Sequence, residues 1–97
     1  EQMIVGICHL DVIIPENHSL KGKRQVIKKI IDRVRNRFNI SIAEVGDNEL
    51  WQRSKLGMSL VGNNRRFVNS YLDRVVNFIE AMNIVDIAHS ELEILNF

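Results

Sequence analysis

The sequence predicts an α+β domain in which two helices cover one face of an antiparallel sheet. Two segments have the spacing of amphipathic helices, and four segments rich in apolar and β-branched residues accompany them in the order strand, helix, strand, strand, helix, strand. The 97 residues are expected to form a single domain, residues 1–97, because this length suits one hydrophobic core. With 45% hydrophobic and 26% charged residues, the composition is that expected of a soluble globular protein.

The first strand is predicted at Met3–Ile14, an apolar, β-branched run that Pro15 ends. Alternation places Cys8, Leu10 and Val12 on the face expected to meet the helices. The opposite face carries Ile7, His9 and Asp11. Cys8 is the only cysteine, which excludes an intramolecular disulfide and favours a buried thiol. Met3 is the expected native start, so Glu1 and Gln2 are expected to be a remnant of expression.

The first helix is predicted to follow a turn at residues 15–18, with Ser19 as its N-cap, and to end at Phe38. Its apolar residues fall within about one third of the helical circumference, which indicates one buried stripe. These residues are Leu20, Ile27, Ile30, Ile31, Val34 and Phe38. A short strand is predicted next, at Asn39–Val45, and the sequence leaves open which of its faces is buried.

The second half of the chain repeats this pattern. A turn at residues 46–49 leads to a third strand at Arg53–Val61, with Leu56, Met58 and Leu60 on one face. Gly62–Asn64 is the predicted turn and cap of a second helix that runs to about Met82. The last strand is predicted at Ile84–Phe97. Its two faces carry Ala88, Ser90, Leu92 and Ile94 on one side, and His89, Glu91 and Glu93 on the other.

These six elements match the split β-α-β pattern of a ferredoxin-like fold. The expected architecture is a two-layer βαββαβ sandwich, with a four-stranded antiparallel sheet and both helices on one face. The first and last strands are neighbours in this arrangement. The other face of the sheet is expected to be open.

The first helix concentrates the positive charge of the chain. Residues 19–38 hold eight of the thirteen lysines and arginines but only one acid, Asp32, so the segment carries +7 and the remaining residues carry −6. The eight cations are Lys21, Lys23, Arg24, Lys28, Lys29, Arg33, Arg35 and Arg37. Such a stripe would orient the protein toward a phosphate backbone, and contacts of this kind position a nucleic acid without reading its sequence.

Two other interpretations of these cations stay open. The stripe could be a solvated helix face whose acidic partners lie elsewhere in the fold. At the start of the helix, free backbone N–H groups together with Lys21, Lys23 and Arg24 could hold a phosphate or carboxylate. Lys23 lies at the edge of the apolar stripe, which favours a structural pairing with an acid such as Glu44 over a ligand contact.

Several short motifs resemble the YlxP-like family of small bacterial proteins of unknown function. They are Ser19-Leu20-Lys21 with Lys23-Arg24, Arg37-Phe38-Asn39, Ala43-Glu44-Val45, Leu50-Trp51-Gln52-Arg53 and Leu72-Asp73-Arg74-Val75-Val76. The resemblance covers Met3 to about Leu95 and implies a ferredoxin-like fold in a bacterial cytoplasmic protein. Genes of this family often lie beside those for translation initiation and ribosome maturation, which implies a ribosome-binding role. The resemblance implies no catalytic residues.

Trp51 and Arg53 form a second candidate contact. An exposed indole beside an arginine suits stacking on single-stranded RNA, whereas a packed indole would close the core or form a subunit contact. Packing or an oligomer contact is the favoured alternative. Arg65 and Arg66 could add an anion contact at the start of the second helix.

The open sheet face is the last candidate. His9, Asp11, His89, Glu91 and Glu93 share it, and such a set could bind a metal or perform acid–base chemistry. A polar solvated face, or pairing of two subunits, is favoured because no close metal-ligand spacing occurs.

Together these observations predict a non-enzymatic, cytoplasmic RNA- or ribosome-associated module. No catalytic residue, metal or cofactor is expected, and no membrane span, since no apolar run is long enough. The alternatives are a homo-oligomeric structural or protein-interaction domain without a nucleic-acid role, and a small metal-binding or enzymatic protein that uses the His9 face.

Overall fold

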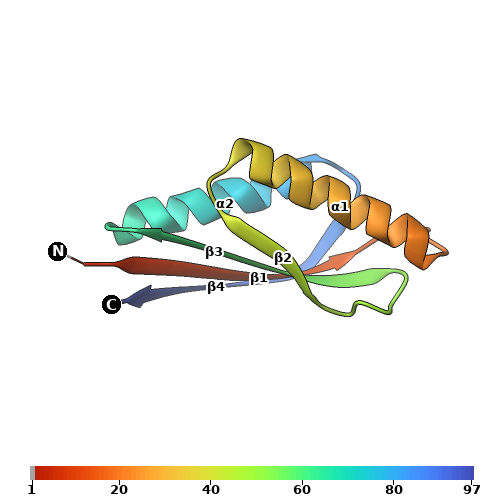
Figure 1. Cartoon of the computed structure of the whole chain (residues 1–97), viewed down its shortest axis with the longest axis horizontal. Helices are drawn as coiled ribbons and strands as arrows, with labels where there is room; N and C mark the ends of the chain where they lie inside the picture. The colour runs from red at the N-terminus through yellow and green to blue at the C-terminus, as the bar shows by residue number, and fades with distance from the viewer. Residues whose placement is uncertain (1) are drawn as a thin grey trace.

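The computed structural model describes residues 2–97, and Glu1, one of the two residues expected to be an expression remnant, lies outside that range. Two helices, α1 (Leu20–Arg37) and α2 (Arg65–Ala81), lie together on one face of a four-stranded sheet (Figure 1). The strands are β1 (Ile4–Ile13), β2 (Ser41–Gly46), β3 (Arg53–Gly62) and β4 (Asp86–Asn96). Both termini lie at one end, and the β2–β3 loop lies beside the start of α1 at the other (Figure 1).

The sheet confirms the predicted ferredoxin-like fold. Its order is β2-β3-β1-β4, and every neighbouring pair is antiparallel. The first and last strands are therefore neighbours, as predicted. The predicted elements differ from the observed ones by at most two residues at their ends, where hydrogen bonding rather than side-chain pattern sets the boundary.

Strand faces follow the predicted alternation with one exception. Cys8, Leu10 and Val12 are buried beneath the helices, and so is Ile42, which answers the question of which face of β2 is buried. On β4 the register shifts, so that Ile87 lies opposite Val12 while Asp11 lies opposite His89. Grouping Ala88 with Ser90, Leu92 and Ile94 was therefore wrong, because this β-bulge interrupts the alternation at Ala88.

Both predicted helix caps are confirmed. The Ser19 hydroxyl accepts a hydrogen bond from the Gly22 N–H at 3.0 Å, and the Asn64 side-chain oxygen accepts one from the Phe67 N–H at 3.0 Å. Each cap satisfies a backbone donor that has no partner within its own helix. Asn83, with φ of 56°, follows α2 in a left-handed conformation that asparagine tolerates.

The core lies between the sheet and the two helices. Its helix residues include Ile27, Ile30 and Val34 from α1 and Val68, Leu72, Val75 and Ile79 from α2. A Cβ atom on Gly6 would lie 2.4 Å from Val68 Cγ1, so the glycine allows α2 to pack directly on the β1 backbone. Burial, together with the charge of Asp73, raises the pKa of the Cys8 thiol to about 11.

A buried ion pair joins α1 to the sheet. The Lys23 ammonium lies 3.1 Å from Glu44 Oε2, and only 1% of the Lys23 side chain is exposed. Ser54 donates to the same carboxylate oxygen at 2.6 Å, and Lys23 also donates to the backbone carbonyl of Asp47. Four segments (α1, β2, the β2–β3 loop and β3) therefore meet at one ammonium group, and the predicted pairing of Lys23 with Glu44 is confirmed.

Removing one member of this pair should destabilise the fold more than removing both. Glu44→Ala leaves a buried ammonium without its counter-ion, so we expect the free energy of unfolding to fall by about 3 kcal/mol. Lys23→Met keeps the buried stem, and the double variant should lose less than the sum of the two single losses. Urea denaturation at neutral pH measures all three values.

The exposed pair Lys28–Asp32 is the matched control for this double-mutant cycle. The two residues lie one helical turn from each other on α1, and Lys28 Nζ is 2.6 Å from Asp32 Oδ2. Both side chains are at least half exposed. Its coupling energy should be about 0.5 kcal/mol or less. Equal coupling energies in the two cycles would contradict the role assigned to the buried pair.

Candidate nucleic-acid interface

The outer surface of α1 carries seven exposed cations, which we call the basic face. They are Lys21, Arg24, Lys28, Lys29, Arg33, Arg35 and Arg37. The apolar stripe of α1 packs against the sheet, so these side chains project away from it. From Lys21 to Arg37 the basic face extends about 24 Å along the helix axis, at about 1.5 Å per residue.

Acidic side chains neutralise very little of the basic face. Within residues 2–97, Lys28 is the only one of the seven cations with an ion pair, and its partner Asp32 is exposed. The other ion pairs found there involve Lys23, Lys55 and His89. Glu44, the acid on the strand next to α1, is occupied by Lys23. The alternative of a helix face neutralised by acids from elsewhere in the fold therefore finds no support in these contacts.

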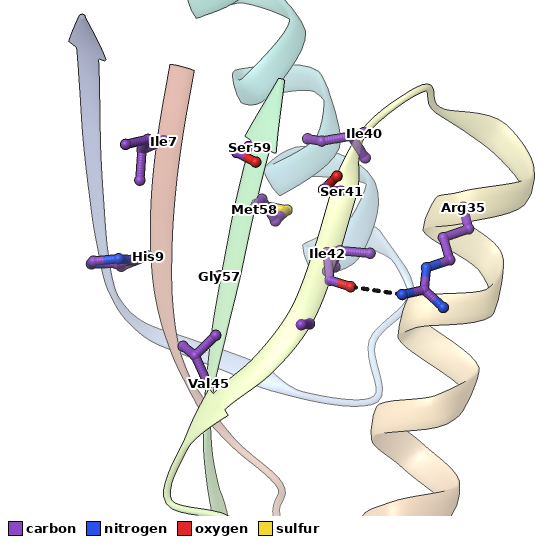
Figure 2. A pocket seen from close by; sticks show the side chains of 11 residues that line it. Ile7, His9, Arg35, Ile40, Ser41, Ile42, Val45, Gly57, Met58 and Ser59 are labelled. Atoms are coloured by element: carbon purple, nitrogen blue, oxygen red, sulfur yellow. Dashed lines mark hydrogen bonds between the residues drawn. The ribbon is translucent and has the colours of Figure 1, made fainter. Parts of the chain in front are cut away.

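Two arginines of the basic face also hold the end of α1 in place. Arg35 donates a hydrogen bond of 3.1 Å to the Ile42 carbonyl of β2 (Figure 2), and the Arg37 guanidinium lies 5.2 Å from the centre of the Phe78 ring. Both cations lie in the last turn of α1, where positive charge interacts favourably with the helix dipole. Arg35 and Arg37 thus have structural roles as well as exposed charge.

Lys23 does not belong to the basic face. Sequence reasoning grouped it with the seven exposed cations as a candidate phosphate contact, but the structure buries it against Glu44. Its position on the helical wheel, at the edge of the apolar stripe, is the signal that separates it from the others.

The β2–β3 loop presents an exposed aromatic group beside the start of α1. We call Leu50 and Trp51 the loop tip; their exposed fractions are 48% and 52%. Asn17 donates from its side chain to the Trp51 carbonyl and, at 2.8 Å, to the Ser19 carbonyl. Gln52 donates to the Asn17 carbonyl at 3.0 Å. These bonds fix the backbone of the loop tip next to the N-terminus of α1.

Sequence reasoning missed Asn17 and Gln52. Both are polar residues in turns that the sequence places more than thirty positions apart, so nothing local indicates that they meet. The only available signal is that Asn17 lies two residues before a helix N-cap, where side-chain to backbone hydrogen bonds are common.

Arg53 lies on the side of the sheet that faces away from the helices. It is the first residue of β3 and lies opposite Ile13, while its neighbour Ser54 is buried on the helix side of the sheet. Alternation therefore directs Arg53 to the uncovered face of the sheet. Arg53 therefore lies on the opposite layer from the basic face of α1.

The uncovered face of the sheet carries the predicted titratable set, and two of its members make short contacts with charged or titratable neighbours. Asp11 Oδ1 lies 2.9 Å from Lys55 Nζ, and His89 Nε2 lies 3.3 Å from Glu91 Oε1. The hydrogen bond from Lys55 lowers the pKa of Asp11 and raises that of Lys55. Over residues 2–97 no group of three or more His, Cys, Asp or Glu side chains is placed to hold a metal ion.

The start of α2 offers less to an anion than its sequence indicates. Arg65 reaches toward β4, where it donates to the Asn96 side chain at 3.1 Å and to the Ile94 carbonyl at 3.4 Å. It therefore ties α2 to the sheet.

In the described part of the chain, no helix is long and apolar enough to cross a membrane.

The solved structures that match this chain include the two that follow. A de novo designed protein, Foldit4, is 15% identical with a TM-score of 0.48, covering 100% of this chain and 97% of that one. A C-terminal segment of the alpha subunit of aIF2 from Pyrococcus abyssi is 10% identical with a TM-score of 0.48, covering 98% of this chain and 51% of that one.

Sequence comparisons reveal a family relationship. "Uncharacterized protein YlxP" of Bacillus subtilis (strain 168) is 40% identical over 78 residues, which cover 80% of this chain and 85% of that protein. The family model described as "Protein of unknown function (DUF503)" matches residues 5–92. That match spans most of β1 through most of β4, and the chain belongs to this family, as its resemblance to YlxP-like proteins predicted.

Proposed function

We propose that this protein is a non-enzymatic RNA-binding module that contacts phosphates through the basic face of α1. The observation that carries the proposal is that six of the seven exposed cations have no acidic partner within residues 2–97. Unpaired cations spaced along about 24 Å of helix match a run of backbone phosphates, and binding would release condensed counterions.

The expected target is ribosomal RNA in the cytoplasm. The gene neighbourhood implied by the resemblance to YlxP-like proteins supports the ribosome as the source of that RNA. A helix cannot read bases in the deep, narrow major groove of A-form RNA, so phosphate contacts from α1 would position the protein without selecting a sequence.

Charge reversal on the basic face tests this proposal. Lys29→Glu with Arg33→Glu removes two cations whose side chains make no hydrogen bond or ion pair in the described chain, so the fold should be retained. We expect at least tenfold weaker binding to ribosomal subunits at low salt, and a salt dependence that is shallower by roughly 1.5 in log K against log salt. Co-sedimentation at several salt concentrations measures both quantities.

A matched control separates local contact from net charge. Arg53→Glu with Arg66→Glu produces the same change in net charge, on β3 and on the first turn of α2 rather than on α1. This control should bind nearly as well as the unmodified protein. Equal loss of binding by the two variants, or no binding by the unmodified protein at low salt, would contradict a contact through α1.

We propose that the loop tip adds a stacking contact with an unpaired base. The support is the exposed side chain of Trp51, whose backbone Asn17 holds beside the start of α1. An aromatic ring next to a cationic helix suits single-stranded RNA, where bases are free to stack.

Single-stranded and duplex RNA should therefore respond differently to Trp51→Ala. Stacking contributes about 1–3 kcal/mol per base, so affinity for a single-stranded oligonucleotide should fall by roughly fivefold to a hundredfold. Affinity for duplex RNA and the slope of its salt dependence should not change. Because Trp51 is the only tryptophan, quenching of intrinsic fluorescence reports the contact directly in the unmodified protein.

Leu50→Ala is the control for this experiment, since it alters the same loop without removing a ring. It should leave both affinities within about twofold, which is within the context dependence of a surface substitution. Equal effects of the two substitutions, or equal effects of Trp51→Ala on single-stranded and duplex RNA, would show that the indole does not stack on a base.

A further inference from the structure

The uncovered face of the sheet carries a continuous apolar patch near the chain termini. We call it the apolar patch and define it by Met3, Val5, Ile7, Val61, Leu95 and Phe97. The register places Val5 beside both Val61 and Leu95, and backbone hydrogen bonds join Met3 to Phe97. The exposed fractions of Met3, Val61 and Phe97 are 49%, 63% and 71%. Exposed apolar groups gathered on one side mark an interaction surface.

Neither helix covers this patch. Both helices lie on the opposite face of the sheet, where Ile4, Cys8 and Leu60 are buried (Figure 1). Antiparallel sheets tolerate one solvated face when that face is polar. The apolar patch departs from that pattern, so solvent alone does not explain its composition.

We propose that a second copy of this chain covers the uncovered face, with a two-fold axis parallel to the strands and above the seam between β1 and β3. Under this symmetry, β1 of one copy faces β3 of the other, and β4 faces β2 of the other. Val5 of each copy then meets Val61 of its partner, so the two apolar patches meet at the seam between β1 and β3. This inference does not depend on the proposed RNA-binding function.

Charge complementarity favours this axis. Residues that are opposite in the β1–β3 register face each other across the interface, so Asp11 of one copy meets Lys55 of the other. The acidic stripe on β4, formed by Glu91 and Glu93, meets Ser41 and Ala43 of β2, which carry no charge. An axis across the strands would instead place the acids of the two β4 strands over one another, at a cost in free energy.

The shape of the face agrees with the same arrangement. Gly57 has no side chain and lines a hollow together with Ile7, His9 and Val45, and the Val45 side chain lies close to the Gly57 backbone (Figure 2). His9 is exposed and lies opposite Gly57 in the register. The proposed symmetry therefore places the imidazole of each copy over the hollow of its partner.

The area is adequate for a stable dimer. Four strands spaced about 4.8 Å apart, with about ten residues at about 3.4 Å each, give a projected face of roughly 600 Å². Side-chain relief makes the accessible area larger than this projection. Standard protein interfaces bury about 800 Å² on each partner, so a face of this size suffices if most of it is used.

Sedimentation equilibrium tests the dimer. The unmodified protein should have twice its chain mass of 11.2 kDa at concentrations up to about 0.5 mM. Val61→Glu places a charge in the apolar patch and should yield a monomer whose far-ultraviolet circular dichroism is unchanged, because Val61 is mostly exposed in the single chain. Leu50→Glu, which alters an exposed leucine outside the face, should remain dimeric.

Two results would overturn the proposal. One is a monomeric mass for the unmodified protein throughout this concentration range. The other is a dimer that persists in Val61→Glu. If Val61→Glu fails to fold, Lys55→Glu provides a second test at an exposed position, since it would set two acids against each other at the seam and should also yield a monomer.

Cysteine cross-linking tests the direction of the axis. In a mixture of Val5→Cys and Val61→Cys chains, one of them tagged, the proposed symmetry places the two new thiols opposite each other across the interface. We expect a disulfide between the two different chains under mild oxidation. Cys8 is buried, so it should not compete. Cross-linking of Val61→Cys chains only with themselves would indicate an axis across the strands and overturn this arrangement.

Discussion

The buried contact of Lys23 with Glu44 is the constraint that holds together the start of α1, β2 and the β2–β3 loop. An ammonium that is 1% exposed must be paired, and its partners come from β2 and from the loop that follows it. The contact therefore fixes the start of α1 against the sheet and fixes the loop that carries Trp51. It also uses Glu44, the acid nearest to α1 on the sheet, so the neighbouring cations of the helix stay exposed and unneutralised.

Opposite layers of the sandwich carry opposite character. The basic face lies on the helix layer, whereas Glu91, Glu93 and Asp11 lie on the uncovered side of the sheet. A near-neutral chain, with a formal charge of +1, therefore concentrates its positive charge on the helix layer. Under the proposed function, the basic face would meet the polyanion and the uncovered face would be left for contacts of a different chemistry.

The two proposed surfaces are compatible because they lie on opposite layers. A dimer formed through the uncovered sheet faces would turn both α1 helices outward and leave both basic faces accessible. Two phosphate-binding surfaces on one particle would gain avidity for an RNA long enough to reach both, and that gain depends on geometry rather than on additional contacts. In such a dimer, the helices would cover one face of each sheet and the partner chain would cover the other.

By itself the sequence determined the element order, both helix caps, the faces of β1 and β3 and the concentration of charge on α1, because these depend on residue spacing within one segment. The pairing of Lys23 with Glu44 was also within reach, since a lysine at the edge of an apolar stripe requires a partner. Only the tertiary structure decided that Ile42 faces the core, that the bulge at Ala88 shifts β4, and that Asn17 and Gln52 hold the loop tip. Each of these depends on contacts between residues distant in the chain, which local periodicity does not encode.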